Sequence, residues 1–95
     1  MTHPPTDPQQ LQAEIHATRL HFLQTELDVG NTMLDTARAS HDDDVRARRW
    51  GRAREAHDEV ARQLAKGDAL GLSDAERARI GDDLARLRER LDDGA

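Results

Sequence analysis

The chain has 95 residues, no cysteine and a formal net charge of −5, and Asp, Glu, Lys and Arg together make up 35% of it. This length predicts a single domain with a thin core. The absence of cysteine excludes disulfides, thiol catalysis and thiolate metal sites, and an acidic chain is a poor general binder of polyanions.

Residues 1–7 contain His3, Pro4 and Pro5 and show no periodic pattern, so we expect a flexible tail. The segment has no basic region followed by an apolar stretch, and nowhere does the chain contain an apolar run long enough to cross a membrane. We therefore expect a bacterial, cytoplasmic protein without a membrane partner.

Residues 8–39 carry the strongest pattern in the chain. Asp7 and Pro8 form a typical helix start. Apolar or small residues then recur at steps of three and four, as on one face of an α-helix, at Leu20, Leu23, Leu27, Gly30, Leu34 and Ala37. A second row runs beside the first, through Ile15, Phe22, Val29 and Met33. The two rows are wider than one partner helix would cover, which predicts a long central helix with neighbours on two sides.

Two shorter helices are expected after it, over residues 43–66 and 73–92. Ser40 or Asp42 can cap the first, and Gly67 ends it. The spacing of Ser73 and Glu76 is that of a capping box. Apolar stripes follow each start, at Trp50, Ala53, His57, Val60 and Leu64, and at Ile80, Leu84, Leu87 and Leu91. The prediction is an all-α, antiparallel three-helix bundle, up-down-up, in one domain over residues 8–93.

Two glycines lie inside the predicted helices, where each costs roughly 1 kcal/mol relative to Ala. Pairing the first two helices about the turn near residue 40 brings Gly30 level with Trp50 and Gly51. A packing role is therefore predicted for these residues: the Trp50 indole lies across Gly30, or the two backbones nearly touch. His57, on the apolar stripe, is expected to be partly buried and bonded to a neighbouring acid or backbone group.

Few residues suggest catalysis or metal binding. His21 and His57 could approach each other and, with Glu14 or Glu26, hold a metal. Asp42, Asp43 and Asp44 are read as helix-capping residues, with a metal-binding acid cluster as the alternative. The chain contains no Gly-rich phosphate loop, nucleophile elbow or paired metal-binding histidines at helical spacing. We therefore expect no enzyme activity, no metal and no cofactor.

Five arginines crowd the first half of the second predicted helix: Arg46, Arg48, Arg49, Arg52 and Arg54. The favoured interpretation is a solvated helix with local ion pairs from Arg48 to Asp44, from Arg52 to Asp44 or Glu55, and from Arg54 to Asp58. The alternative is a basic patch for an acidic protein or a nucleic acid backbone. Nucleic acid is disfavoured because the helix has only a small positive excess and the chain offers few aromatic stacking platforms.

The spacing of Trp50, Ala53, His57 and Ala61, with Leu27 and Gly30 before it, resembles a tetratricopeptide-type helical hairpin over about residues 20–66. That family packs helix pairs into scaffolds that bind other proteins and is not catalytic. The chain departs from its repeat, because Gly30 and Ala53 are already too far apart for a unit of about 34 residues and no second copy follows. No binding residue is carried over.

The function expected from the sequence is a small non-catalytic protein–protein interaction or assembly module, with a regulatory nucleic-acid or anion binder as the alternative. The first helix overhangs the second, and Leu11 and Ile15 lie in the overhang. A two-fold homodimer through the first helix, or another protein, would bury them. The expected interaction residues are Leu11, Ile15, Phe22, Val29 and Met33. In the competing arrangement, Leu70 and Leu72 fold over the overhang and close the monomer.

Overall fold

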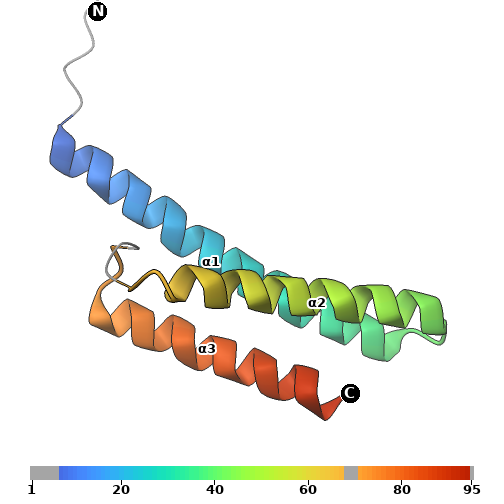
Figure 1. The fold of residues 1–95 in the computed structure, drawn as a ribbon. Coiled ribbons are helices and arrows are strands. Elements are labelled where there is room, and N and C mark those ends of the chain that lie inside the picture. The colour runs from blue at the N-terminus through green and yellow to red at the C-terminus, as the bar shows by residue number, and fades with distance from the viewer. Residues whose placement is uncertain (1–6, 68–70, 95) are drawn as a thin grey trace, which may run out of the picture.

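The computed structural model describes residues 7–67 and 71–94, which form three α-helices: α1 (Pro8–Ala39), α2 (Asp43–Leu64) and α3 (Asp74–Asp93). α2 runs antiparallel to α1, and α3 returns in the direction of α1 (Figure 1). Each helix packs against both others, so the predicted all-α, up-down-up bundle is confirmed. The tail predicted for residues 1–7 lies outside the described residues apart from Asp7, and so does Leu70.

Side chains at the helix starts explain why the helices begin where they do. Asp7 Oδ1 accepts a hydrogen bond from Gln9 N at 3.0 Å, and Asp42 Oδ1 accepts from Asp44 N at 2.9 Å. Ser73 and Glu76 form the reciprocal capping box. Each bond satisfies an amide that has no partner within its own helix.

The helix bounds lie within two residues of the prediction. α1 has the predicted bounds, α2 ends two residues earlier, and α3 begins and ends one residue later. α2 is shorter because Lys66 N donates to Gln63 O at 3.1 Å, which tightens the chain into a turn before Gly67. Gly67 has φ +60°, a backbone conformation that glycine adopts without steric cost.

The core lies where the three helices meet. α1 contributes the predicted row, and α2 contributes mostly small side chains, which allow the two helices to approach closely. Leu72 belongs to this core, and Leu11 and Ile15 at the start of α1 stay exposed. The buried apolar residues are Leu23, Leu27, Leu34, Ala37, Ala53, Ala56, Val60, Leu72, Ile80, Leu87 and Leu91.

Gly30 does have a packing role, but the neighbour predicted for it is wrong. A methyl group at Gly30 would lie 2.7 Å from Leu87 Cδ2 and 3.6 Å from Ala56 Cβ, whereas one at Gly51 would meet nothing within 4 Å. Counting residues across the turn gives the height of a residue along a helix, not the side of the helix on which it lies. Trp50 instead contacts Gly94, just after α3.

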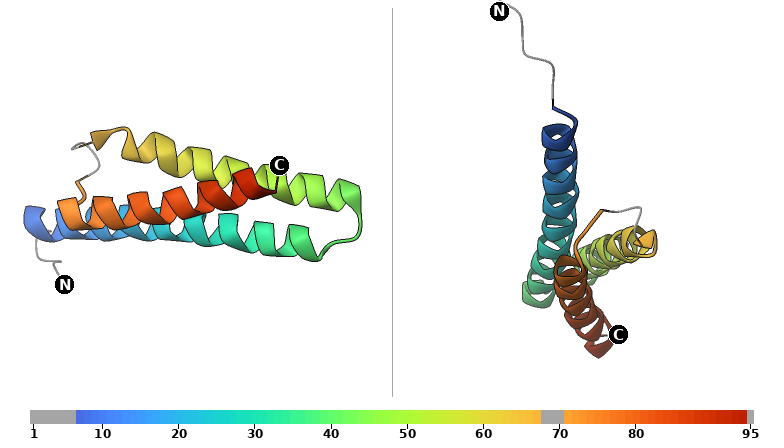
Figure 2. Two further views of the ribbon diagram at one scale, coloured as in Figure 1. Left: turned by 90° about the horizontal axis from the view of Figure 1, so that it is seen from below. Right: turned by 90° about the vertical axis from the view of Figure 1, so that its left-hand side faces the viewer.

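α1 extends beyond both other helices at its N-terminal end, where it stands clear of α2 and α3 (Figure 2). It has 32 residues against 22 in α2 and 20 in α3. The predicted overhang is therefore present. It leaves Leu11 and Ile15 exposed, whereas Phe22 is exposed although it lies within the part of α1 that packs in the bundle.

Candidate interaction face on α1

The row predicted for interaction divides into an open part and a partly covered part. Leu11, Ile15 and Phe22 are 47%, 42% and 43% exposed. Val29 and Met33 are half-buried, and Met33 packs against the core. We call Leu11, Ile15 and Phe22 the open row.

The open row is not a continuation of the core of this chain. On the side of α1 that faces the core, the last partly buried residues toward the N-terminus are Leu20 and His16. The next residues on that side, Gln12 and Gln9, are polar and exposed. These glutamines border an open hollow of about 610 Å³ beside Gly71. Ile15 borders the same hollow, so the open row runs along its edge, and α2 and α3 leave both Leu11 and Ile15 exposed.

A groove runs along the inner end of the open row, where α1 meets the C-terminal half of α2. Thr18, Arg19, Phe22 and Leu23 line it from α1, and Gln63 lines it from α2. Its volume is about 250 Å³, enough for one aliphatic side chain. The groove and the open row share Phe22, so together they form one continuous exposed strip along α1.

His16 holds the base of the overhang to the rest of the bundle. Its Nδ1 lies 2.8 Å from the Gly71 carbonyl oxygen, and its Nε2 lies 3.0 Å from Glu76 Oε2. Both ring nitrogens face acceptors, so both bonds form only when the imidazole is protonated. The Glu76 carboxylate and then the Gly71 carbonyl raise the pKa of His16 above 6.5, while the Ser73 amide and then His16 lower the pKa of Glu76.

This bridge should make stability depend on pH. Because the folded pKa of His16 is raised, its contribution is fully present below 6.5 and is lost as pH rises through the folded value. The melting temperature of wild type should exceed that of His16→Gln at about pH 6, and the difference should shrink by about pH 9. Glu76→Gln keeps the capping box but removes the charge that faces His16. The melting temperature of this variant should also lie below that of wild type at about pH 6, and the difference should also shrink by about pH 9. A deficit of His16→Gln that is equal at both pH values would contradict the bridge.

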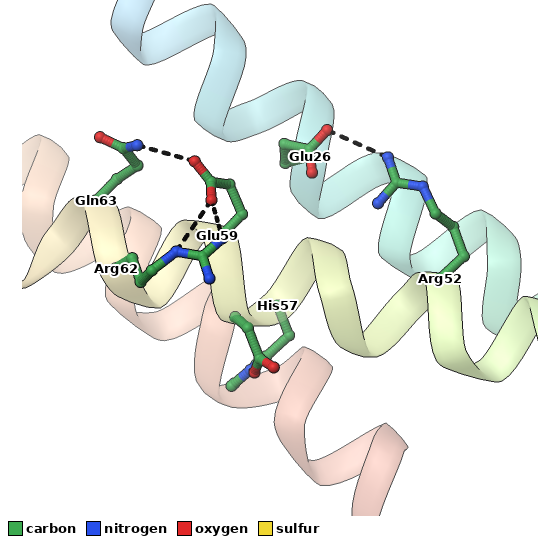
Figure 3. Close-up of polar contacts among 7 residues, drawn as sticks. Glu26, Arg52, His57, Glu59, Arg62 and Gln63 are labelled. Atoms are coloured by element: carbon green, nitrogen blue, oxygen red, sulfur yellow. Dashed lines mark hydrogen bonds and ion pairs between the residues drawn. The ribbon is translucent and has the colours of Figure 1, made fainter.

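His57 follows its prediction. Its side chain is 12% exposed, and Nδ1 lies 3.0 Å from Asp58 Oδ1. On the same helix, Glu59 accepts hydrogen bonds from Arg62 and Gln63 (Figure 3). The Arg62 guanidinium and then the Gln63 amide lower the pKa of the Glu59 carboxyl.

Three arginines of the cluster in the first half of α2 do not make the local pairs predicted for them: Arg48, Arg52 and Arg54. Arg52 reaches across to Glu26 of α1, with Nη2 3.5 Å from Oε1, rather than to Asp44 or Glu55 (Figure 3). Among the described residues, Arg48 and Arg54 make no ion pair with Asp44 or Asp58.

Two further arginines of this cluster hold the α1–α2 turn. Arg46 donates to the Ser40 carbonyl at 2.8 Å and lies 3.9 Å from Asp43, while Arg49 donates to the Thr36 carbonyl at 3.4 Å. Three of the five side chains thus contact their own hairpin. The local pair predicted for Arg52 is wrong because Glu26 of α1 accepts from it instead.

Trp50 lies among the clustered arginines in the first half of α2. It is half-buried, packs against the core and, with Gly94, borders an open hollow of about 320 Å³ that also touches Arg46 and Arg54. This hollow is smaller than the one beneath the overhang and is flanked by charged side chains. Through its contact with Gly94, Trp50 packs α2 against the residue that follows α3.

Within residues 7–67 and 71–94, no group of three or more His, Asp or Glu side chains is arranged to hold a metal ion. In the same part of the chain, no helix combines the length and the hydropathy needed to cross a bilayer. Comparisons with family models, with curated proteins and with solved structures give no match. The likeness to a tetratricopeptide hairpin therefore stays a resemblance in spacing.

Proposed function

We propose that this protein is a small non-catalytic helical module that binds another protein chain through the open row of α1. The observation that carries the proposal is the alignment of Leu11, Ile15 and Phe22, three large apolar side chains exposed on one face of one helix. Single exposed apolar residues are common, whereas an aligned group marks an interaction surface.

The distribution of charge supports the same segment of α1. The chain is 35% charged, yet between residues 8 and 25 only Glu14 and Arg19 belong to the Asp, Glu, Lys and Arg residues counted in that figure. Depletion of charged residues is the compositional mark of the centre of a protein–protein interface. If this part of α1 were simply exposed to solvent, we would expect about the same fraction of charged residues as in the rest of the chain.

The test replaces Ile15 and Phe22 together with Glu. The matched control places the same two charges at Gln10 and Ala17, which are exposed on the same helix but off the open row. Wild type and both variants are immobilised, and the bound proteins, including free copies of this chain, are compared. Ile15→Glu with Phe22→Glu should lose the binding that the control retains. Identical binding by all three proteins would contradict the proposed function.

The Arg cluster is the site of the alternative function, binding of nucleic acid or another anion. It is disfavoured because three of its five side chains are engaged within the hairpin, those of Arg46, Arg49 and Arg52. We expect Arg48→Ala with Arg52→Ala to change stability by less than about 1 kcal/mol, the usual range for exposed pairs. Heat denaturation measures this change, and chromatography on heparin at physiological salt measures anion binding. Salt-sensitive retention of wild type that the double variant loses would instead establish the alternative.

A further inference from the structure

We propose that the chain that docks on the open row is a second copy of this protein, lying antiparallel, so that Leu11 of each copy enters the groove beside Phe22 of the other. The proposal rests on the proposed function and names the partner. The overhang presents the exposed aliphatic side chain of Leu11, and the groove has room for a side chain of that size. The proposal rests on this match.

The overhang cannot fill the groove of its own chain. α1 is one continuous helix from Pro8 to Ala39. Leu11 and Phe22 are eleven residues apart on it, which is about 16 Å along the axis. A second copy is the simplest source of a helix with the right side chain, because it brings an identical Leu11.

The spacing along α1 fits an antiparallel copy. Leu11, Ile15, Thr18 and Phe22 are all exposed and follow one another at steps of four, three and four. This order reads the same in both directions, so an antiparallel copy keeps register, with Leu11 opposite the partner copy's Phe22 and Ile15 opposite its Thr18. Steps of three and four are those of a helix seam that packs on one other helix.

The shape of the molecule favours the same arrangement. The N-terminal end of α1 stands clear of α2 and α3 (Figure 2). In an antiparallel pair with this register, each overhang lies beside residues 18–25 of the other copy's α1, and the two bundles lie at opposite ends. In a parallel pair both bundles would lie at the same level and compete for space beside the paired helices.

Charge is compatible with self-association at this face. Each chain has a formal net charge of −5, but Glu14 and Arg19 make residues 8–25 neutral overall when His is uncharged. Antiparallel pairing brings Glu14 towards the partner copy's His21, a pair without like charges. Because each copy both gives and receives Leu11, the contact is closed by a two-fold axis and stops at a dimer.

The first test measures dissociation by sedimentation equilibrium of the full chain. Leu11→Lys should raise the dissociation constant by about a hundredfold, because the substitution enters the interface twice and each buried side chain is worth about tenfold. The matched control, Gln10→Lys, adds the same charge at the neighbouring exposed position and should leave the constant within about threefold of wild type. Circular dichroism checks that both variants keep their helix content.

The second test measures orientation. The chain has no cysteine, so a nitroxide can be attached at Gln10→Cys, Ala17→Cys or Gln24→Cys, three exposed positions seven residues apart on one face of α1. In the antiparallel pair the two labels at position 17 lie almost level, whereas the two labels at position 10, or at position 24, are offset by about 20 Å along the axis. The distance between the two labels should therefore be shortest at position 17.

Two outcomes overturn the proposal. Equal label distances at all three positions would show a parallel pair, and a wild-type mass of one chain at tens of micromolar would exclude the second copy. Neither outcome removes the proposed function. That function fails only if Ile15→Glu with Phe22→Glu leaves every binding partner unchanged.

Discussion

Replacing Gly30 with Leu should destabilise the fold by more than about 3 kcal/mol, the upper end of ordinary overpacking. A Cβ at this position would lie 2.7 Å and 3.3 Å from the two Cδ atoms of Leu87, which is fully buried, and 3.6 Å from Ala56 Cβ. Leu adds three more carbon atoms in that space, so α1 would have to separate from α2 and α3. The gain in helix propensity of about 1 kcal/mol offsets only part of this cost.

Gly51→Leu is the matched control, because it makes the same change in α2 where nothing lies within 4 Å. It should raise stability by about 0.5–1 kcal/mol through helix propensity alone. Heat denaturation followed by circular dichroism measures both variants. If Gly30→Leu melts at or above the wild-type temperature, Gly30 does not lie at the contact described.

Leu87→Ala should cost about 3–5 kcal/mol, the range for removing a fully buried leucine when the cavity does not collapse. Leu87 is 0% exposed and contacts the position of Gly30, so it links α3 to the α1–α2 hairpin. A domain of this size has a total stability of only about 5–15 kcal/mol. Urea denaturation should therefore show a much lower midpoint.

Leu84→Ala provides the comparison for that prediction. Leu84 lies one turn away on α3 and is only partly buried against the core. Leu84→Ala should therefore lower the free energy of unfolding clearly less than Leu87→Ala does. Adding Gly30→Ala to Leu87→Ala should recover part of the stability, because the new methyl group enters the cavity. Equal losses from Leu84→Ala and Leu87→Ala, with no recovery, would contradict the packing described.

The sequence was sufficient to predict the helices and the side of α1 that is buried. The steps between Leu23, Leu27 and Leu34 record burial directly, since one face of a helix repeats about every 3.6 residues. Asp42 and Ser73 mark helix starts through local hydrogen bonds. The open part of the second row was also foreseeable, because the apolar stripe of α3 is too narrow to cover it. The length of α3 is not the reason, since Glu76 in its first turn reaches His16, beyond the level of Phe22.

The contacts between helices could not be predicted in the same way. Gly30 meets Leu87 rather than Trp50 because the rotation of a helix about its axis depends on all its neighbours at once. Long polar side chains add to the difficulty. Three pairs join residues far apart in sequence: Glu26 with Arg52, His16 with Glu76, and Asp35 with Arg90. No spacing rule relates such residues, so the role of His16 at the base of the overhang had no signal in the sequence.

The mass of the wild-type protein in solution tests the binding of a second copy to the open row most directly. Sedimentation equilibrium at tens of micromolar should give twice the 10.7 kDa of one chain, and Ile15→Glu with Phe22→Glu should give the mass of one chain while keeping its helix content. A wild-type mass of 10.7 kDa at that concentration would show that the open row of α1 does not bind a second copy.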